Sequence, residues 1–145
     1  MKRHPSLAHL SRDHHQALIL AQLLKKGSAA YKGLPTAVEE KGEYALKLYQ
    51  VDLKQHFGKE ETIIRKINGI TPDIDQLGDE IIKEHTELSL LFSEIKSSGD
   101  LVEHLDKIGH KLEQHIRKEE RIFFPMIEKH CGEKILDEIE SFLSP

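Results

Sequence analysis

Apolar residues recur along this chain at intervals of three and four, which is the spacing of helices that bury one face. There is no sustained alternation with a period of two, so we expect no strands. Residues that typically begin or end helices divide the pattern into four long helices and a short fifth. The predicted ranges are 6–26, 36–66, 71–97, 100–131 and 133–143.

Particular residues mark the helix ends. Thr36 and Asp100 each begin a capping-box pattern, and Thr71 precedes a proline in the first turn of the third helix. Asn68-Gly69 is typical of a helix C-terminus, and Gly42 is expected to break or bend the long second helix. The connections are short, so neighbouring helices should be antiparallel. The predicted fold is all-α: an up-down-up-down antiparallel four-helix bundle with a short C-terminal fifth helix.

Composition and charge narrow the class of protein. The 145 residues are expected to form one domain, 1–145. The net charge of -4, with no basic block, indicates no nucleic-acid partner. We find no apolar run of membrane-spanning length and no signal peptide, so we expect a cytoplasmic protein without a membrane partner. The single cysteine, Cys131, rules out an internal disulfide.

One six-residue pattern, His-x-x-x-Glu-Glu, occurs twice, at 56–61 and at 115–120. On a helix, residues i and i+4 lie on one face, about 6 Å apart along the axis. Each copy can therefore direct an imidazole and a carboxylate toward one point. His14 and His85 lie on the apolar faces of the first and third helices. The candidate metal ligands are His14, His56, Glu60, His85, His115 and Glu119.

Each candidate ligand replaces a hydrophobe in the apolar stripe of its helix. The second stripe is Ala45, Leu48, Asp52, His56, Glu60, Ile63 and Ile67, and the fourth is Leu105, Ile108, Leu112, His115, Glu119 and Ile122. At about 1.5 Å per residue the six candidates fall in one layer of the bundle. Without metal, this layer would bury two carboxylates and four imidazoles at a heavy desolvation cost. We therefore expect a site for two metal ions, and the minor alternative is a metal-free helical bundle.

Several motifs occur together: Asp13-His14-His15, Glu84-His85, the two His-x-x-x-Glu-Glu copies, and Phe123-Phe124-Pro125 after the second copy. Over about residues 6–130 this set resembles the hemerythrin-like (HHE cation-binding) domain family, and in particular its prokaryotic branch. The resemblance implies a non-haem di-iron centre held by the six candidates. Glu60 and Glu119 would bridge the two irons together with an oxo or hydroxo group. Imidazole and carboxylate ligands alone suit manganese or zinc as well as iron.

Two departures from oxygen-carrying hemerythrins bear on reactivity. Those proteins place a second histidine one turn later on the third helix, where this chain has Ser89. They also use His-x-x-x-x-Asp on the last helix, where this chain has His115-x-x-x-Glu119. Counting ligands on two six-coordinate irons leaves two positions open, against one with a fifth histidine. His15, Glu61 and Glu120 are the nearest residues that could fill them.

The resemblance implies a protein that binds or reacts with dioxygen, nitric oxide or redox equivalents, for storage, sensing or scavenging. Its partner would be a small diatomic ligand, and the sequence identifies no protein partner. The alternative is a di-iron enzyme that reduces peroxide or nitric oxide, or that supplies iron for the repair of damaged iron centres. No general acid or substrate pocket is recognisable in the sequence, so the two readings stay open.

Other unusual residues are interpreted as structural. Phe123-Phe124-Pro125 is expected to close the core beneath the site and to kink the last helix. Tyr49 lies far from the predicted metal layer and is expected to pack. Cys131 is interpreted as an incidental surface cysteine, and His104 and His110 as histidines outside the site.

Overall fold

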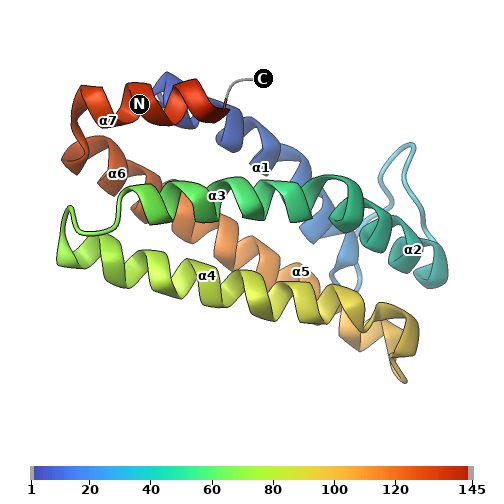
Figure 1. Cartoon of the computed structure of the whole chain (residues 1–145). Helices are drawn as coiled ribbons and strands as arrows, with labels where there is room; N and C mark the ends of the chain where they lie inside the picture. Colours follow the sequence, from blue (N-terminus) through green and yellow to red (C-terminus); the bar gives the residue numbers. More distant parts are fainter. Residues whose placement is uncertain (1, 144–145) are drawn as a thin grey trace.

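The computed structural model describes residues 2–143, and within them it contains helices and no strand. Four helical rods run antiparallel to their neighbours in the chain (Figure 1). The predicted all-α four-helix bundle with a short C-terminal helix is confirmed. The first rod is α1 (Pro5–Leu24), and the second consists of α2 (Val38–Leu48), η1 (Tyr49–Leu53) and α3 (Lys54–Lys66). The third is α4 (Pro72–Ser93) with the 3-10 turn η2 (Ile95–Ser97), and the fourth consists of α5 (Leu101–Lys118), η3 (Glu119–Phe123) and α6 (Phe124–His130). The terminal helix is α7 (Gly132–Leu143).

Two of the three predicted caps are present. The Thr71 side chain accepts a hydrogen bond from the amide of Ile74 (3.0 Å), and the Asp100 side chain accepts one from the amide of Glu103 (3.2 Å). The Thr36 cap is wrong, because α2 begins after Ala37 without a side-chain cap. Gly42 does not break the second rod. It lies inside α2, where an added Cβ would be 3.2 Å from Ile95 Cγ2.

The segments η1 and η3 are π-helical, and each wide turn changes which residues face the core. In η1, Leu53 is buried and Asp52 is exposed. In η3, Phe123 is buried and Ile122 is 51% exposed. The predicted core positions of Asp52 and Ile122 are therefore wrong, since that prediction assumed regular α-helical spacing. Pro125 lies at the start of α6, so its missing amide hydrogen falls at the junction after η3.

The interior consists of two apolar clusters with a polar layer between them. One cluster includes Leu20, Leu53, Phe92, Leu105 and Ile108, toward the α2 end of the bundle. The other includes Leu7, Ile63, Ile81, Phe123 and Ile127, toward the α7 end. On every long rod the candidate ligands lie between residues of the two clusters.

The α7 helix folds back along α1 at the end of the bundle where the chain begins (Figure 1). It buries Leu136 and Ile139 in the second apolar cluster. Cys131, just before it, is only 6% exposed, and burial raises the pKa of its thiol. The interpretation of Cys131 as a surface residue is thus wrong. Tyr49 packs as expected, with its ring stacked on Phe92 at 4.8 Å between centroids.

No helix within residues 2–143 is both long enough and apolar enough to cross a membrane.

The α1 and α5 helices approach each other closely at a glycine. A Cβ added at Gly109 would lie 2.6 Å from the backbone oxygen of Ala21, which cannot move away as a flexible side chain can. Gly58 on α3 is also helical but has no atom within 4 Å of an added Cβ. The two glycines therefore provide a matched test of the α1–α5 contact.

We predict that Gly109→Ala destabilises the fold by about 1–3 kcal/mol, because overpacking forces α1 away from α5. Gly58→Ala should instead stabilise it by about 0.5–1 kcal/mol, since alanine is the better helix former. Urea unfolding of both variants measures the two effects. Equal stability changes of the same sign would show that the helices are not in tight contact at Gly109.

Candidate metal centre

The structure brings all six candidate ligands together in the polar layer, and none is more than 5% exposed. They form two groups, in each of which one ligand-type atom per residue lies within 4.8 Å of the others. The first group joins α1 to α3 through His14 and His56, and the second joins α4 to α5 through His85 and His115. Both groups contain the same two carboxylates, Glu60 and Glu119.

The Nε2 atoms of the histidines point toward these carboxylates. Glu60 faces both groups: its Oε2 is 2.9 Å from His56 Nε2, and its Oε1 is 2.9 Å from His85 Nε2. Glu119 also faces both, since its Oε1 is 3.2 Å from the Nε2 atoms of His14 and of His115. A carboxylate placed between two pairs of imidazoles is the arrangement needed to bridge two cations.

Hydrogen bonding does not satisfy the centre of the layer. Glu60 Oε2, His115 Nε2 and both carboxylate oxygens of Glu119 are buried and have no hydrogen-bond partner in the described part of the chain. Buried polar atoms are nearly always partnered in native proteins. These atoms lie close to potential hydrogen-bond partners but not at hydrogen-bonding angles. Atoms that converge on a shared ligand are arranged in this way. Each group offers two imidazole nitrogens and two carboxylates, and that set suits iron, manganese or zinc.

In each of the four histidines of the layer, the outer nitrogen, Nδ1, donates to a carboxylate on a neighbouring rod. The pairs are His56 with Asp13 (3.1 Å), His85 with Glu61 (2.8 Å), His115 with Glu84 (2.6 Å) and His14 with Glu120 (2.6 Å). Each rod thus supplies one carboxylate to the next rod and receives one from the rod before. The four pairs close into a ring around the layer, which we call the carboxylate ring.

The family-model comparison agrees with this geometry. The model of the hemerythrin HHE cation-binding domain matches residues 6–127, with a further match over 78–141. The chain belongs to the hemerythrin HHE cation-binding family. A search of curated proteins and a search of solved structures gave no match. Domains of the HHE family bind cations, and this HHE domain has buried histidine and glutamate groups able to hold a metal.

The structure changes the interpretation of the three residues that could have filled open metal positions. Glu61 and Glu120 were candidates for open metal positions, yet each accepts a hydrogen bond from the outer nitrogen of a histidine. His15 is exposed and does not reach the layer. Asp13 and Glu84 belong to the carboxylate ring, and the sequence reasoning gave neither of them a role. The available signal was adjacency, because each ring carboxylate is next in sequence to a candidate ligand.

Two ring carboxylates are also paired with cations. Glu84 forms an ion pair with Lys118, and Arg3 lies 3.1 Å from Glu120. Although burial opposes charge on Glu84, hydrogen bonds from His115 and Lys118 lower its pKa to about 2. The pKa of Asp13 is also lowered, mainly by its hydrogen bond with His56. The ring carboxylates Asp13 and Glu84 are therefore anionic at neutral pH and hold the imidazole Nδ1–H groups in place.

The centre of the layer favours positive charge. The pKa is raised to about 12 for His14, to about 9 for His56 and to about 10 for His115. Burial opposes a charge on each imidazole, but the carboxylates around them outweigh it. The pKa of Glu60 is correspondingly held well below its usual range, against its burial, by the charge of His56 and by the other imidazoles close to its carboxylate. A metal cation would compete with these protons for the same atoms.

Aromatic rings cover two of the imidazoles. Phe57 stacks on His85 with 4.1 Å between ring centroids, and Phe124 stacks on His14 at 5.5 Å. These contacts cover one face of each imidazole and restrict rotation of the rings. Phe124 thus contacts the site directly, as expected of a residue closing the core beneath it.

The remaining histidines lie outside the layer. His104 bonds to the backbone oxygen of Leu91 (2.7 Å), and His110 is exposed and pairs with Asp106. A third group of ligand-type atoms, His4, Glu133 and Asp137, lies near the surface. His4 Nδ1 in that group is already bonded to Ser6.

We predict that Glu61→Ala or Glu84→Ala weakens metal binding by about 10–100-fold, because a histidine then loses the partner that orients its ring. Glu87→Ala is the matched control. Glu87 lies on α4 near Glu84 but pairs with Lys111 at the surface. Competition with a chromophoric chelator measures the affinity. If all three variants bind equally well, the carboxylate ring does not support the ligands.

Proposed function

We propose that this HHE domain holds two iron ions and binds or reacts with small molecules such as dioxygen or nitric oxide. His14 and His56 would hold one ion, and His85 and His115 the other. Glu60 and Glu119 would bridge the two. The supporting observation is that two buried four-residue groups share both of their carboxylates. A site for one metal ion, or a layer with a purely structural role, would not need this arrangement.

The assignment of iron as the metal rests on family membership and on the ligand set together. Imidazole and carboxylate ligands suit manganese and zinc as well, and these are the alternatives for the metal. When bound, iron supplies redox chemistry and affinity for dioxygen, nitric oxide and peroxide. The residues of this chain supply its position, its charge balance and a buried surrounding.

Open coordination positions would let a small molecule bind at the centre. Ser89, one turn after His85, carries no imidazole. His15 is exposed, and the carboxylates of Glu61 and Glu120 point to outer nitrogens. None of the four residues supplies a further ligand in this arrangement. Storage, sensing or scavenging of a small diatomic molecule is therefore our first candidate.

The same open positions favour a second candidate, an enzyme that reduces peroxide or nitric oxide. Release of iron for the repair of damaged iron centres belongs to this second class. The two candidates share the metal centre and differ in whether the small molecule leaves unchanged. Reaction kinetics separate them.

We predict about two metal ions per chain after anaerobic iron reconstitution, with a near-ultraviolet charge-transfer band after exposure to air. His56→Ala and His115→Ala should each lower the metal content, because each removes a ligand from one group. His110→Ala and His130→Ala, whose side chains are exposed, serve as controls. Elemental analysis gives the ratios, and one ion or fewer per wild-type chain would overturn the dinuclear proposal.

We predict that the diferrous protein binds nitric oxide or azide readily and is oxidised rapidly by oxygen. Ser89→His should lengthen the lifetime of any oxygen adduct, since the new imidazole would lie about 6 Å along the helix axis from His85 on the same face. Stopped-flow absorbance follows both reactions. A wild-type adduct that is stable for hours and unchanged by Ser89→His would favour the carrier over the enzyme.

A further inference from the structure

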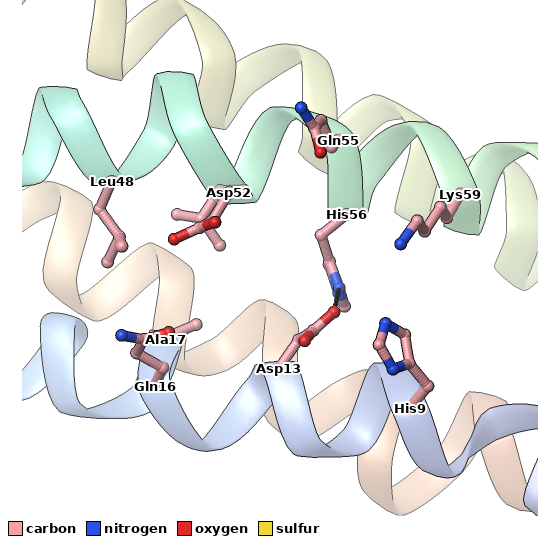
Figure 2. A pocket seen from close by; sticks show the side chains of 10 residues that line it. His9, Asp13, Gln16, Ala17, Leu48, Asp52, Gln55, His56 and Lys59 are labelled. Atoms are coloured by element: carbon pink, nitrogen blue, oxygen red, sulfur yellow. Dashed lines mark hydrogen bonds and ion pairs between the residues drawn. The ribbon is translucent and has the colours of Figure 1, made fainter. Parts of the chain in front are cut away.

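A surface cleft of about 220 Å³ opens between α1 and the rod formed by η1 and α3 (Figure 2). Seven hydrogen-bonding side chains line it, among them His56 of the candidate metal centre, and the other six come in equal numbers from the two rods. They are His9, Asp13 and Gln16 on one side and Asp52, Gln55 and Lys59 on the other. Figure 2 shows the Asp13–His56 pair in the middle of this cleft, so the cleft reaches the carboxylate ring.

A second, much smaller cavity lies deeper, beside the candidate metal centre. Its volume is about 10 Å³, and its walls include His14, His115 and Glu119. Leu112 and Ile116 of α5 line it but do not line the surface cleft. A space of this size holds roughly one water molecule. We call it the inner chamber.

The cleft and the inner chamber share part of their walls. Asp13, Ala17, Leu53 and His56 line both. Two of these four, Asp13 and His56, are fixed to each other by a hydrogen bond. The other two, Ala17 and Leu53, are apolar, make no such bond, and are 2% and 5% exposed. The four shared residues form a partition that separates the inner chamber from solvent. Because no hydrogen bond joins Ala17 to Leu53, we expect this partition to open most easily between them.

The wide turn η1 builds this partition. It directs Leu53 into the core and leaves the neighbouring Asp52 in the cleft. Regular α-helical spacing would instead place the Asp52 carboxylate on the core face. On the opposite side of the polar layer, Leu10, Ile63 and Phe123 are at most 2% exposed and close the core.

We propose that small molecules reach the His14–His56 side of the centre through this cleft, passing between Ala17 and Leu53. The size of the inner chamber restricts the route to molecules of about the size of dioxygen, nitric oxide or hydrogen peroxide. The polar mouth admits hydrogen-bonding molecules as well as gases. What happens to these molecules at the centre rests on the proposed function, whereas the route itself does not.

The route is tested without iron, so that no paramagnetic metal interferes. Dissolved oxygen is itself paramagnetic and broadens the methyl NMR signals of the residues it visits. Under oxygen pressure, the methyls of Leu112 and Ile116 should relax faster than those of Ile63 and Ile81. Ala17→Leu should remove most of this effect at Leu112 and Ile116, yet leave it at Leu48 in the cleft, because the added side chain fills the partition.

Ala8→Leu is the matched control, since Ala8 is on the same helix but lines neither cavity. In the iron-loaded protein, Ala17→Leu should slow azide or nitric oxide binding on the order of tenfold, a barrier increase of about 1.4 kcal/mol, with an unchanged final spectrum. Leu53→Ala should accelerate it. This second variant carries the test if Ala17→Leu does not fold.

Unchanged oxygen relaxation at Leu112 and Ile116 in Ala17→Leu would overturn the route. Equal relaxation of Ile63, Ile81, Leu112 and Ile116 in the wild type would do the same. If oxygen reaches Leu112 and Ile116 as predicted but the protein fails to load two irons, the route is supported and the proposed function is overturned. The two failures are therefore distinguishable.

Discussion

The burial of six ionisable side chains in one layer is the constraint around which the rest of the bundle is arranged. Every imidazole in this layer has two nitrogens to satisfy, and an unpartnered buried polar group is costly. The inner nitrogens face the shared carboxylates Glu60 and Glu119, and the outer nitrogens bond to the carboxylate ring. Because each rod both supplies and receives a ring carboxylate, moving one rod would break two of the four pairs. The ring thus couples the position of every rod to the geometry of the centre.

Helix geometry explains why the ring carboxylates are sequence neighbours of the candidate ligands. Adjacent residues on a helix point about 100° apart around its axis. When one of them points to the centre of the bundle, the next can reach the adjacent rod. Glu60 and Glu61 show this on α3: the first meets the imidazoles of both groups, and the second meets the outer nitrogen of His85. A double acidic motif therefore supplies one inner and one outer carboxylate from a single turn.

Regular periodicity and single-residue signals were sufficient to predict the bundle, the Thr71 and Asp100 caps and the convergence of the six candidate residues. They failed at Asp52 and Ile122, because a π-helical turn depends on tertiary contacts that spacing does not encode. The stacking of Tyr49 on Phe92 of α4 is one such contact at η1. Cys131 was misjudged for a similar reason, since its burial depends on α7 folding back. Adjacency in sequence to a candidate ligand could identify the members of the carboxylate ring. Predicting which histidine each carboxylate meets would also have required the order and rotation of the rods.

The two halves of the centre are chemically alike, so their ligands cannot explain a difference in reactivity. In each half, one histidine pairs with a carboxylate backed by a cation, Arg3 for His14 and Lys118 for His115. The other pairs with Asp13 or Glu61, which form no ion pair with lysine or arginine within residues 2–143. The halves differ in what lies beside them. Both histidines of the first half, His14 and His56, border the inner chamber, whereas in the second half only His115 does and Phe57 stacks on His85. Under the proposed route, the cleft shaped by the wide turn η1 leads to the His14–His56 half, and this access is what would distinguish the two metal positions.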